Sequence, residues 1–348
     1  MATNLSTAHH RASTLHGGMN YSWLEQYYNG TPGINYMDYI NLGDLPAVQA
    51  HIQLMSTIGF STLRLPVSFD HWKLRTLPYI ISASTYFTAI DQIITWCDTY
   101  GMKLIIDNHF GVLSDASYPT EVSRVSSIWT QVAHRYRNTD PEKVFFEIYN
   151  EPFNISDSNW KNSAIAFVNA IRAEAPNHTI VVGANDWNII TKLVVMGVLE
   201  DPNIIYTFHY YDPLLFSHQG ATWGGPDVQI TGVPFPYNSS TMPANSPSSS
   251  YYSSYPTDAT YTKLLNDISV AKNFGARYNV PVWCGEFGSY APYAPNDGSR
   301  CRYVGGIKGD LDKLMMPYAY WEWDEGFSIF NGAPSIPNLP ACMAAIFP

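Results

Sequence analysis

Two glutamates at the ends of strand-like segments are the residues of this sequence best placed to do chemistry. Glu151 stands in an Asn-Glu-Pro tripeptide, after an apolar, aromatic and β-branched run at residues 144–149. Glu286 lies near the end of a second such run at residues 281–287. Two facing carboxylates suit hydrolysis of a glycosidic bond, because one protonates the leaving oxygen while the other attacks the anomeric carbon or activates water.

The two carboxyl groups need different surroundings, because one must be protonated and the other ionised near neutral pH. Arg64, in the apolar run at residues 61–67, provides such a difference. A cation in an apolar strand requires a carboxylate partner, and the pairing keeps that carboxylate ionised. We therefore expect Arg64 to lie beside Glu286. A separation of about 5–5.5 Å between the carboxyl groups would indicate retention of configuration, and about 6.5–9.5 Å would indicate inversion.

Other polar and aromatic side chains stand where strand-like runs end. They are His109 in the run 103–109, Asn150 beside Glu151, His209 and Tyr211 in the run 204–211, and Trp323 in the run 318–324. Trp321 and Trp323 alternate with Glu322, and the Asp that follows Trp323 favours Trp323 as the residue at the strand end. Glu147 shares a strand with Glu151 but comes four residues earlier, so we expect it to lie away from the rim.

Eight strand-like runs alternate with segments of helical periodicity, and this order decides how the candidate residues are positioned. The strands are expected at residues 15–21, 61–67, 103–109, 144–149, 179–185, 204–211, 281–287 and 318–324. The helices are expected at residues 45–58, 85–100, 122–136, 158–174, 191–199, 259–278, 303–315 and 340–346. The alternation predicts a (β/α)8 TIM barrel, an α/β fold whose active site is built at the C-terminal ends of the strands.

The domain organisation follows from the same order. Residues 1–14 are expected to be a polar N-terminal tail, and residues 15–348 one catalytic barrel domain. Residues 212–257, rich in Ser, Tyr, Pro and Gly, are expected to form a long irregular loop after the sixth strand, and such a length indicates a functional role. A doubly wound open sheet is the alternative, disfavoured because no glycine-rich phosphate loop follows the first strand.

Composition limits the partners of the protein. Of the 348 residues, 46% are apolar and 14% are charged, which indicates a well-packed globular protein. The net charge of -10 argues against nucleic acid and acidic polysaccharides. Aromatic residues make up 15%, which suits flat, partly apolar, hydroxylated ligands. We expect no membrane span and no signal peptide, because the sequence lacks a long apolar run and a basic start followed by an apolar segment.

The four cysteines have no metal-ligand spacing, so the sequence predicts no metal site. Cys97 and Cys284 lie in apolar helix and strand contexts that are typical of buried thiols. The sequence leaves open whether Cys301 and Cys342 form a disulfide.

Taken in order, these residues resemble glycoside hydrolase family 5, the cellulase-type family of retaining barrel glycosidases. The matching positions are Arg64 in Leu-Arg-Leu-Pro-Val, His109 after Ile-Ile-Asp-Asn, Asn150-Glu151-Pro152, His209-x-Tyr211, Glu286 in Cys-Gly-Glu-Phe-Gly, and Trp323. The resemblance implies that Glu151 is the acid/base and Glu286 the nucleophile. It implies that Asn150 hydrogen-bonds the sugar 2-hydroxyl and that Arg64 and Tyr211 hold Glu286. It also implies that His109 and His209 contact the sugar and the carboxylates, and that Trp323 is a stacking platform.

The resemblance also implies retaining, endo-acting hydrolysis of β-1,4-glucan without a cofactor. The partner would be a β-linked polysaccharide, the enzyme a monomer, and its location secreted, periplasmic or at the cell surface. A β-mannanase or xyloglucanase would differ only in its contacts to the sugars. Residues 17–20 match the family's opening pattern loosely and receive no role. Further aromatic residues are candidates for sugar stacking: Trp23, Trp72, Phe110, Tyr118, Trp187 and Trp223.

Two other classes of function fit the sequence less well. A metal-dependent barrel hydrolase needs clustered His and Asp ligands, typically with a His-x-His pair on an early strand. The adjacent His9 and His10 lie in the expected polar tail instead. A non-catalytic carbohydrate-binding barrel would not need Arg64 together with two carboxylates, because a neutral sugar can be bound without such charges.

Overall fold

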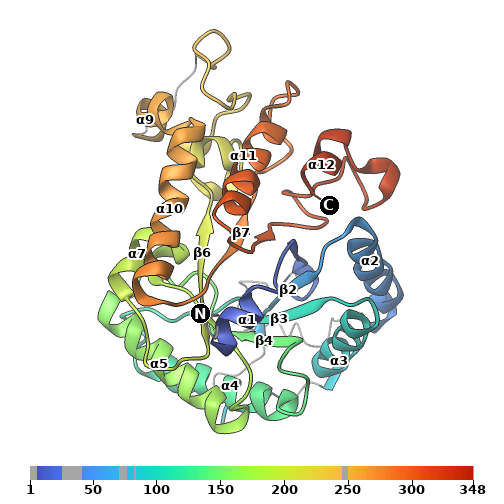
Figure 1. Cartoon of the computed structure of the whole chain (residues 1–348), viewed down its shortest axis with the longest axis vertical. Helices are drawn as coiled ribbons and strands as arrows, with labels where there is room; N and C mark the ends of the chain where they lie inside the picture. Colours follow the sequence, from blue (N-terminus) through green and yellow to red (C-terminus); the bar gives the residue numbers. More distant parts are fainter. Residues whose placement is uncertain (1–5, 26–40, 70–76, 82–83, 245–249, 348) are drawn as a thin grey trace, which may run out of the picture.

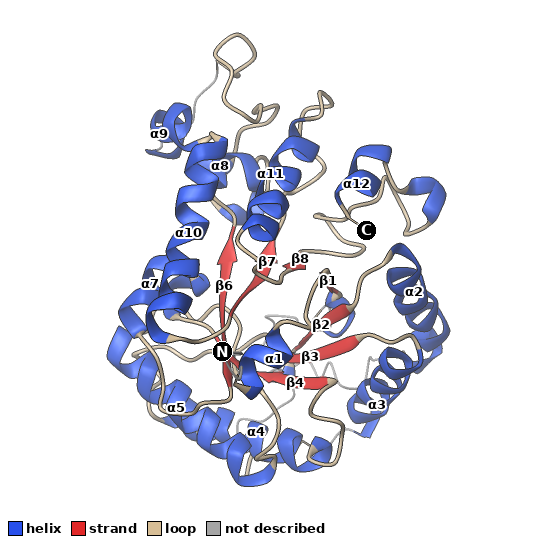
Figure 2. Ribbon diagram, in the orientation of Figure 1, coloured by secondary structure: helices blue, strands red, loops and turns tan. Residues whose placement is uncertain are grey.

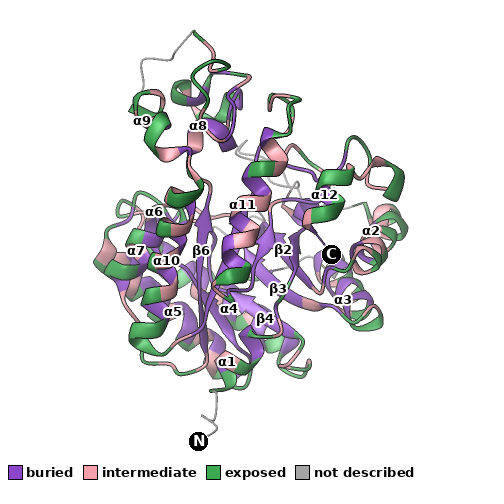
Figure 3. Ribbon diagram, turned by 45° about the horizontal axis from the view of Figure 1, so that its top comes forward, coloured by how far each residue is buried: buried purple, intermediate pink, exposed green. Residues whose placement is uncertain are grey.

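Eight parallel β-strands form the centre of the protein in a computed structural model that describes residues 6–25, 41–69, 77–81, 84–244 and 250–347. The strands are β1 (Gly18–Asn20), β2 (Thr62–Val67), β3 (Lys103–Asn108), β4 (Val144–Glu147), β5 (Ile180–Val182), β6 (Ile204–Tyr210), β7 (Val282–Phe287) and β8 (Ala319–Tyr320). Figure 3 shows that these strands are buried on both faces, as expected where parallel strands face a core on one side and helices on the other.

The sheet curls round so that its last strand meets its first. Each strand from β1 to β6 pairs with the next one in the chain, and β1 also pairs with β8. A parallel bridge between Cys284 and Tyr318 brings β7 and β8 together. The predicted (β/α)8 barrel is therefore confirmed, and an open doubly wound sheet is excluded.

Helices surround the strands (Figures 1 and 2). They are α2 (Leu45–Ile58), α3 (Ser84–Thr99), α4 (Thr120–Tyr136), α5 (Asp157–Glu174), α6 (Asn185–Asn188), α7 (Ile190–Met196), α10 (Tyr261–Tyr278), α11 (Ser299–Lys313) and α12 (Ala341–Ile346). The expected loop at residues 212–257 is partly helical, with α8 (Leu214–Ser217) and α9 (Ser250–Asp258) in addition to irregular turns. None of the helices described is long and apolar enough to cross a membrane.

The prediction of a polar N-terminal tail is wrong from residue 7 onward, because residues Thr7–Ala12 form helix α1, which packs onto the barrel. Figure 3 shows α1 at the lower end of the strands. Ala12 and Leu15 join a buried cluster with residues near the starts of the strands, such as Ile105 and Trp283. Arg11, only 5% exposed, donates to the Glu142 carboxylate (2.7 Å) and anchors the helix. The helix therefore covers the end of the barrel opposite the strand C-termini.

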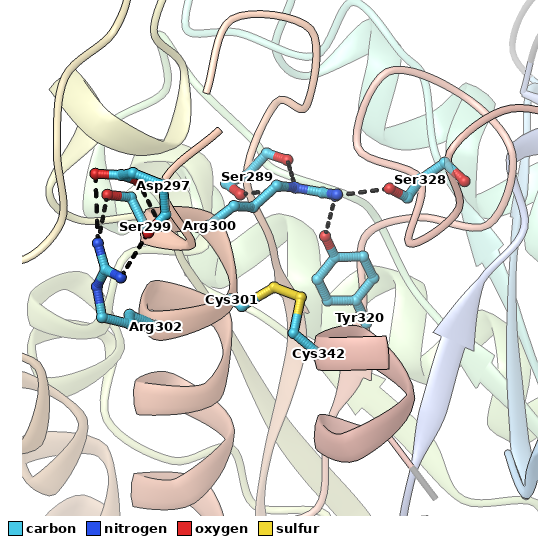
Figure 4. The surroundings of a disulfide bond; sticks show 9 residues. All are labelled: Ser289, Asp297, Ser299, Arg300, Cys301, Arg302, Tyr320, Ser328 and Cys342. Atoms are coloured by element: carbon cyan, nitrogen blue, oxygen red, sulfur yellow. Dashed lines mark hydrogen bonds and ion pairs between the residues drawn. A yellow bond between two sulfur atoms is a disulfide. The ribbon is translucent and has the colours of Figure 1, made fainter. Parts of the chain in front are cut away.

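A disulfide joins Cys301 in α11 to Cys342 in α12, so the pairing that the sequence left open is present (Figure 4). Cys97 and Cys284 are buried free thiols, as expected. Next to the disulfide, the guanidinium of Arg300 donates to the Tyr320 hydroxyl (2.9 Å) and to the carbonyl of Ser328 (2.7 Å). Helix α11 is thus tied both to α12 and to the loop that follows β8.

Candidate active site

Arg64, at the middle of β2, is the centre of a buried network of charges at the C-terminal ends of the strands. Its side chain is inaccessible to solvent and donates two hydrogen bonds to Glu147 (2.7 and 2.9 Å) and one to Glu286 (2.6 Å). A third carboxylate, Asp107, lies 3.1 Å from the same guanidinium. These carboxylates raise the pKa of Arg64 well above its ordinary value although burial opposes the rise, so the residue is a permanent cation. The predicted contact with Glu286 is confirmed.

Glu147 was expected to lie away from the site, but in the structure it contacts Arg64 and is part of the charge network. It is the last residue of β4 and is fully buried, with both carboxylate oxygens on Arg64. Side chains alternate along a strand, so Glu147 faces the barrel interior on the same side as Phe145. This bidentate pair fixes the guanidinium and leaves Nη1 directed at Glu286.

Glu286, in β7, is held on both carboxylate oxygens. Oε1 accepts from Arg64, and Oε2 accepts from the Tyr211 hydroxyl at 2.9 Å. Gly285 before it makes a bulge opposite β6, and a side chain there would come within 3.1 Å of the His209 ring. Glycine is therefore required for His209 and Glu286 to lie side by side in the register. Burial raises the pKa of Glu286, and the positive charge of Arg64 opposes that rise.

Glu151 lies beyond the end of β4, in a backbone conformation (φ 42°) that few non-glycine residues adopt. Its side chain is 27% exposed, and its Oε1 is 2.7 Å from Nδ1 of His209. Burial raises the pKa of Glu151 to about 7, because Arg64 lowers it less than burial raises it and Glu147 adds to the rise. Burial also lowers the pKa of His209 to about 4, so this imidazole is neutral near pH 7.

The side chains of Asn150 and His109 stand beside the two glutamates. The Asn150 carbonyl oxygen accepts from Arg64 (2.8 Å), which turns its amide nitrogen toward His109 (3.4 Å). The other ring nitrogen of His109 lies 2.7 Å from Asp107. Burial lowers the pKa of His109 to about 3, so its imidazole is neutral. Asn150 therefore keeps an N–H directed away from Arg64, where a sugar hydroxyl can accept it.

The prediction that Trp323 presents its ring to a ligand is wrong. Trp323 is 0% exposed and packs edge-on against Phe330 (ring centroids 4.8 Å apart). Trp321 is half-buried instead, and its ring stacks on the site residue His109 (5.4 Å, planes 8° apart). Strand β8 ends at Tyr320, so the Asp that follows Trp323 does not mark the end of the strand, as the choice of Trp323 assumed.

The other aromatic candidates differ in exposure. Trp187 and Trp223 are largely exposed, at 54% and 62%, whereas Trp23 is buried. Phe110 and Tyr118 are half-buried, and Trp72 lies outside the described residues. Trp187 stacks on Phe153 (5.6 Å, planes 6° apart), which follows Glu151 by two residues and is itself 45% exposed. The backbone N–H of Trp187 donates to the carbonyl of Pro152 (3.4 Å), so the pair forms an open aromatic surface attached to the segment that carries Glu151.

Sequence reasoning also missed Asn20 and Asn188. Asn20, in the loosely matching opening, accepts from Arg64 (2.9 Å) and donates to the carbonyl of Gly285 (3.0 Å). Asn188 lies 3.3 Å from Nε2 of His209. Buried asparagines at the ends of expected strands or in the loops beyond them were the available signal, since such side chains need partners.

The separation of the glutamates limits the chemistry that they can perform. Oxygens of Glu151 and Glu286 and a nitrogen of His209 all lie within 4.8 Å of one another. This spacing fits the short separation of a retaining pair and falls below the 6.5–9.5 Å or so that an inverting enzyme needs for its water. Within the described part of the chain, this trio is also the one group whose spacing would allow a metal ion to bind.

Comparison with known proteins places this geometry in a family. The family model described as Cellulase (glycosyl hydrolase family 5) matches residues 25–326, most of the chain. The chain belongs to glycosyl hydrolase family 5. The membership expected from the sequence motifs is therefore confirmed, and Arg64, Glu151 and Glu286 all lie within the matched region.

Individual known proteins are similar to most of this chain. Endoglucanase 3 of Fibrobacter succinogenes is 28% identical over 88% of the chain, and Endoglucanase H of Acetivibrio thermocellus is 28% identical over 80%. The chain spans 51% and 27% of these two relatives. The crystal structure of a hyperthermophilic endo-β-1,4-glucanase in complex with substrate superposes with a TM-score of 0.80 at 21% identity, covering 98% of this chain and 99% of that one, and shares the fold.

Proposed function

We propose that the protein is a retaining, endo-acting glycoside hydrolase that cleaves β-1,4-glucan by double displacement. The observation that carries this proposal is the pair Glu151 and Glu286, less than 4.8 Å apart at their nearest ligand oxygens, with the direct Arg64 contact on Glu286 only. One carboxyl group is thereby poised to be an acid and the other a carboxylate. The endoglucanase names of the similar proteins support the same chemistry.

In the first step Glu286 attacks the anomeric carbon while Glu151 protonates the leaving oxygen. Glu286 is suited to attack because Arg64 and the Tyr211 hydroxyl hold its two oxygens, one on each. Glu151 is suited to give its proton because its raised pKa keeps a large fraction of the carboxyl protonated near pH 7. In the second step Glu151 takes a proton from water, which releases the sugar from Glu286.

Asn150 and Trp321 are proposed to position the sugar that is attacked. The Asn150 amide nitrogen donates to the sugar 2-hydroxyl, a contact that strengthens in the transition state. Trp321, half-buried and braced against His109, supplies an apolar face for the same sugar ring. Trp321 thus takes the role of stacking platform that was expected of Trp323.

The exposed aromatic pair of Phe153 and Trp187 is proposed to bind sugars on the leaving-group side, because both residues adjoin Pro152, the residue after the acid Glu151. Three successive residues, Asp186 to Asn188, have φ near +55°, and such strain persists where surrounding structure enforces it. A platform beyond the attacked sugar favours cleavage within a chain. We infer that the enzyme is secreted, periplasmic or at the cell surface, because a polymeric glucan is too large to enter the cytoplasm. We also propose that it is a monomer.

The test of this proposal is product analysis on soluble β-glucan, mannan, xylan and xyloglucan. We expect mixed oligosaccharides from β-glucan early in the reaction, with the β-anomer as the first product. Preferential cleavage of mannan or xyloglucan would contradict the proposed substrate but not the proposed mechanism. An α-anomer as the first product would contradict double displacement.

Substitution of the two tryptophans separates binding from stability. Trp321→Ala is expected to lower kcat/KM by about tenfold, since about 50 Å² of ring surface at about 25 cal/mol per Å² is lost to the sugar. Trp323→Ala is expected to cost about 3–5 kcal/mol of stability, because it empties a buried site. Thermal unfolding and kinetics of both variants check this, and a kinetic defect confined to Trp323→Ala would restore the original assignment.

The pH dependence of kcat/KM should reflect Glu151. Its folded pKa is raised to about 7, so the protonated acid is present below that pH and is lost as the pH rises through it. We therefore expect kcat/KM to fall tenfold per pH unit above about pH 7. Rates measured from pH 5 to pH 9 check this. A rate that stays level up to pH 9 would show that Glu151 is not the acid.

A further inference from the structure

We propose that Glu151, His209 and Glu286 also bind a zinc ion, which occupies the place of the glycosidic bond and inhibits the enzyme. Nδ1 of His209 is 2.7 Å from Oε1 of Glu151 and 3.4 Å from Oε2 of Glu286. Ligands at about 2.0–2.2 Å from a tetrahedral zinc ion are roughly 3.3 Å from one another. All three ligand atoms lie within 4.8 Å of one another, so shifts of about 1–1.5 Å would bring them around one ion.

Each ligand keeps an atom available for the metal. Arg64 occupies Oε1 of Glu286, so Oε2 remains on the side of His209, where its other neighbour is the Tyr211 hydroxyl. Glu151 is 27% exposed, so an ion can reach the group from solvent and keep water as its fourth ligand. His209 and Glu286 are almost fully buried and are held in place by their neighbours.

Asn188 can stabilise the tautomer of His209 that binds a metal through Nδ1. It is fully buried, its amide nitrogen lies 3.3 Å from Nε2, and its carbonyl oxygen has no hydrogen-bond partner among the described residues. If the side-chain amide rotates by about 180°, its oxygen can accept a hydrogen bond from a protonated Nε2 of His209. Nδ1 then carries the lone pair. Either setting leaves one amide atom unpaired, and the hydrogen bond that Nδ1 gives up to Glu151 is replaced by the bonds of both groups to the metal. Histidines that bind metals usually donate their second nitrogen to such an oxygen.

The charge around the site favours a dication. Arg64 faces three carboxylates, those of Asp107, Glu147 and Glu286, before Glu151 is counted. The site thus carries more carboxylates than cations, and a divalent ion offsets the excess. One imidazole with two carboxylates matches zinc, whereas Mg²⁺ prefers oxygen ligands alone in octahedral geometry.

Zinc at this position is an inhibitor and not a cofactor, because it engages both carboxyl groups that the proposed reaction needs free. This consequence rests on the proposed function, whereas the binding itself does not. A chelator should therefore leave the activity of zinc-free enzyme unchanged and restore the activity of zinc-treated enzyme.

The experiment is calorimetric titration of the whole protein with ZnCl2, without glycan. We expect one ion per chain at this site and at least tenfold weaker binding by Glu151→Gln and by Glu286→Gln. His134→Ala is the matched control, since His134 also lies 2.8 Å from a carboxylate, that of Glu174, but is exposed and pairs with that one carboxylate among the described residues. It should bind zinc as the unchanged protein does, and MgCl2 should give no such binding.

The contact between Asn188 and Nε2 of His209 allows a second test. Asn188→Ala should weaken zinc binding by about 10–100-fold, and Asn188→Asp, which keeps an acceptor beside Nε2, should not. Equal zinc affinity of the unchanged protein and both glutamine variants would place the ion elsewhere and overturn the proposal. Because no glycan is present, inactivity of the protein on every polysaccharide would leave this result unaffected. Zinc that binds here without raising the apparent Kd of a cello-oligosaccharide would overturn the inhibitory role.

Discussion

Glu286→Gln is expected to lower kcat on soluble β-glucan by more than about 10⁴-fold. The amide of glutamine cannot attack the anomeric carbon to form a glycosyl ester, and no other carboxylate that Arg64 contacts is exposed to a sugar. Steady-state kinetics on the purified variant check this. Oligosaccharide binding, measured by calorimetry, should remain close to that of the unchanged protein, because glutamine keeps the shape of the side chain.

The fold of Glu286→Gln should survive, and this follows from the charges around Arg64. The cation keeps its bidentate pair with Glu147 and its contact with Asp107, so no buried charge is left alone. Glu174→Gln is the control, since Glu174 also lies 2.8 Å from a histidine but sits outside the site. Near-normal turnover by Glu286→Gln with an intact fold would remove it from the role of nucleophile.

The barrel could be predicted because hydrophobic periodicity is a local signal that repeats along the chain. Helix α1 was missed because its stability comes from distant partners. Arg11 pairs with Glu142, far away in the sequence, and the short polar stretch around His9 and His10 has no periodicity of its own. The helices within residues 212–257 were missed for a related reason: α8 is only four residues long, and α9 contains a proline.

The site could be predicted in part because the ends of parallel strands meet at one rim. The requirement that a buried cation has a partner correctly placed Arg64 beside Glu286. The same requirement does not state how many partners share the cation, so Glu147 and Asp107 were missed although both contact it. The choice of Trp323 failed because it took the Asp after Trp323 as the end of the strand, whereas β8 already ends at Tyr320.

Glu151→Gln should produce a defect that depends on the leaving group. On β-glucan, whose leaving alcohol needs a proton, kcat is expected to fall by about 10²–10⁴-fold. On an aryl glycoside with an acidic phenol, formation of the glycosyl-enzyme should stay fast because the phenolate leaves unprotonated. The second step should remain slow on both substrates, since Gln cannot take a proton from the attacking water.

This combination predicts a burst. Mixing the Glu151→Gln variant with the aryl glycoside should release one phenol per enzyme quickly and then continue slowly, because sugar accumulates on Glu286. Rapid-mixing absorbance and the mass of the intact protein measure the burst and the trapped sugar. The raised pKa of Glu151 makes the same group an acid in one step and a base in the next, so one substitution must affect both. An equal loss on both substrates without a burst would assign that proton transfer to another residue.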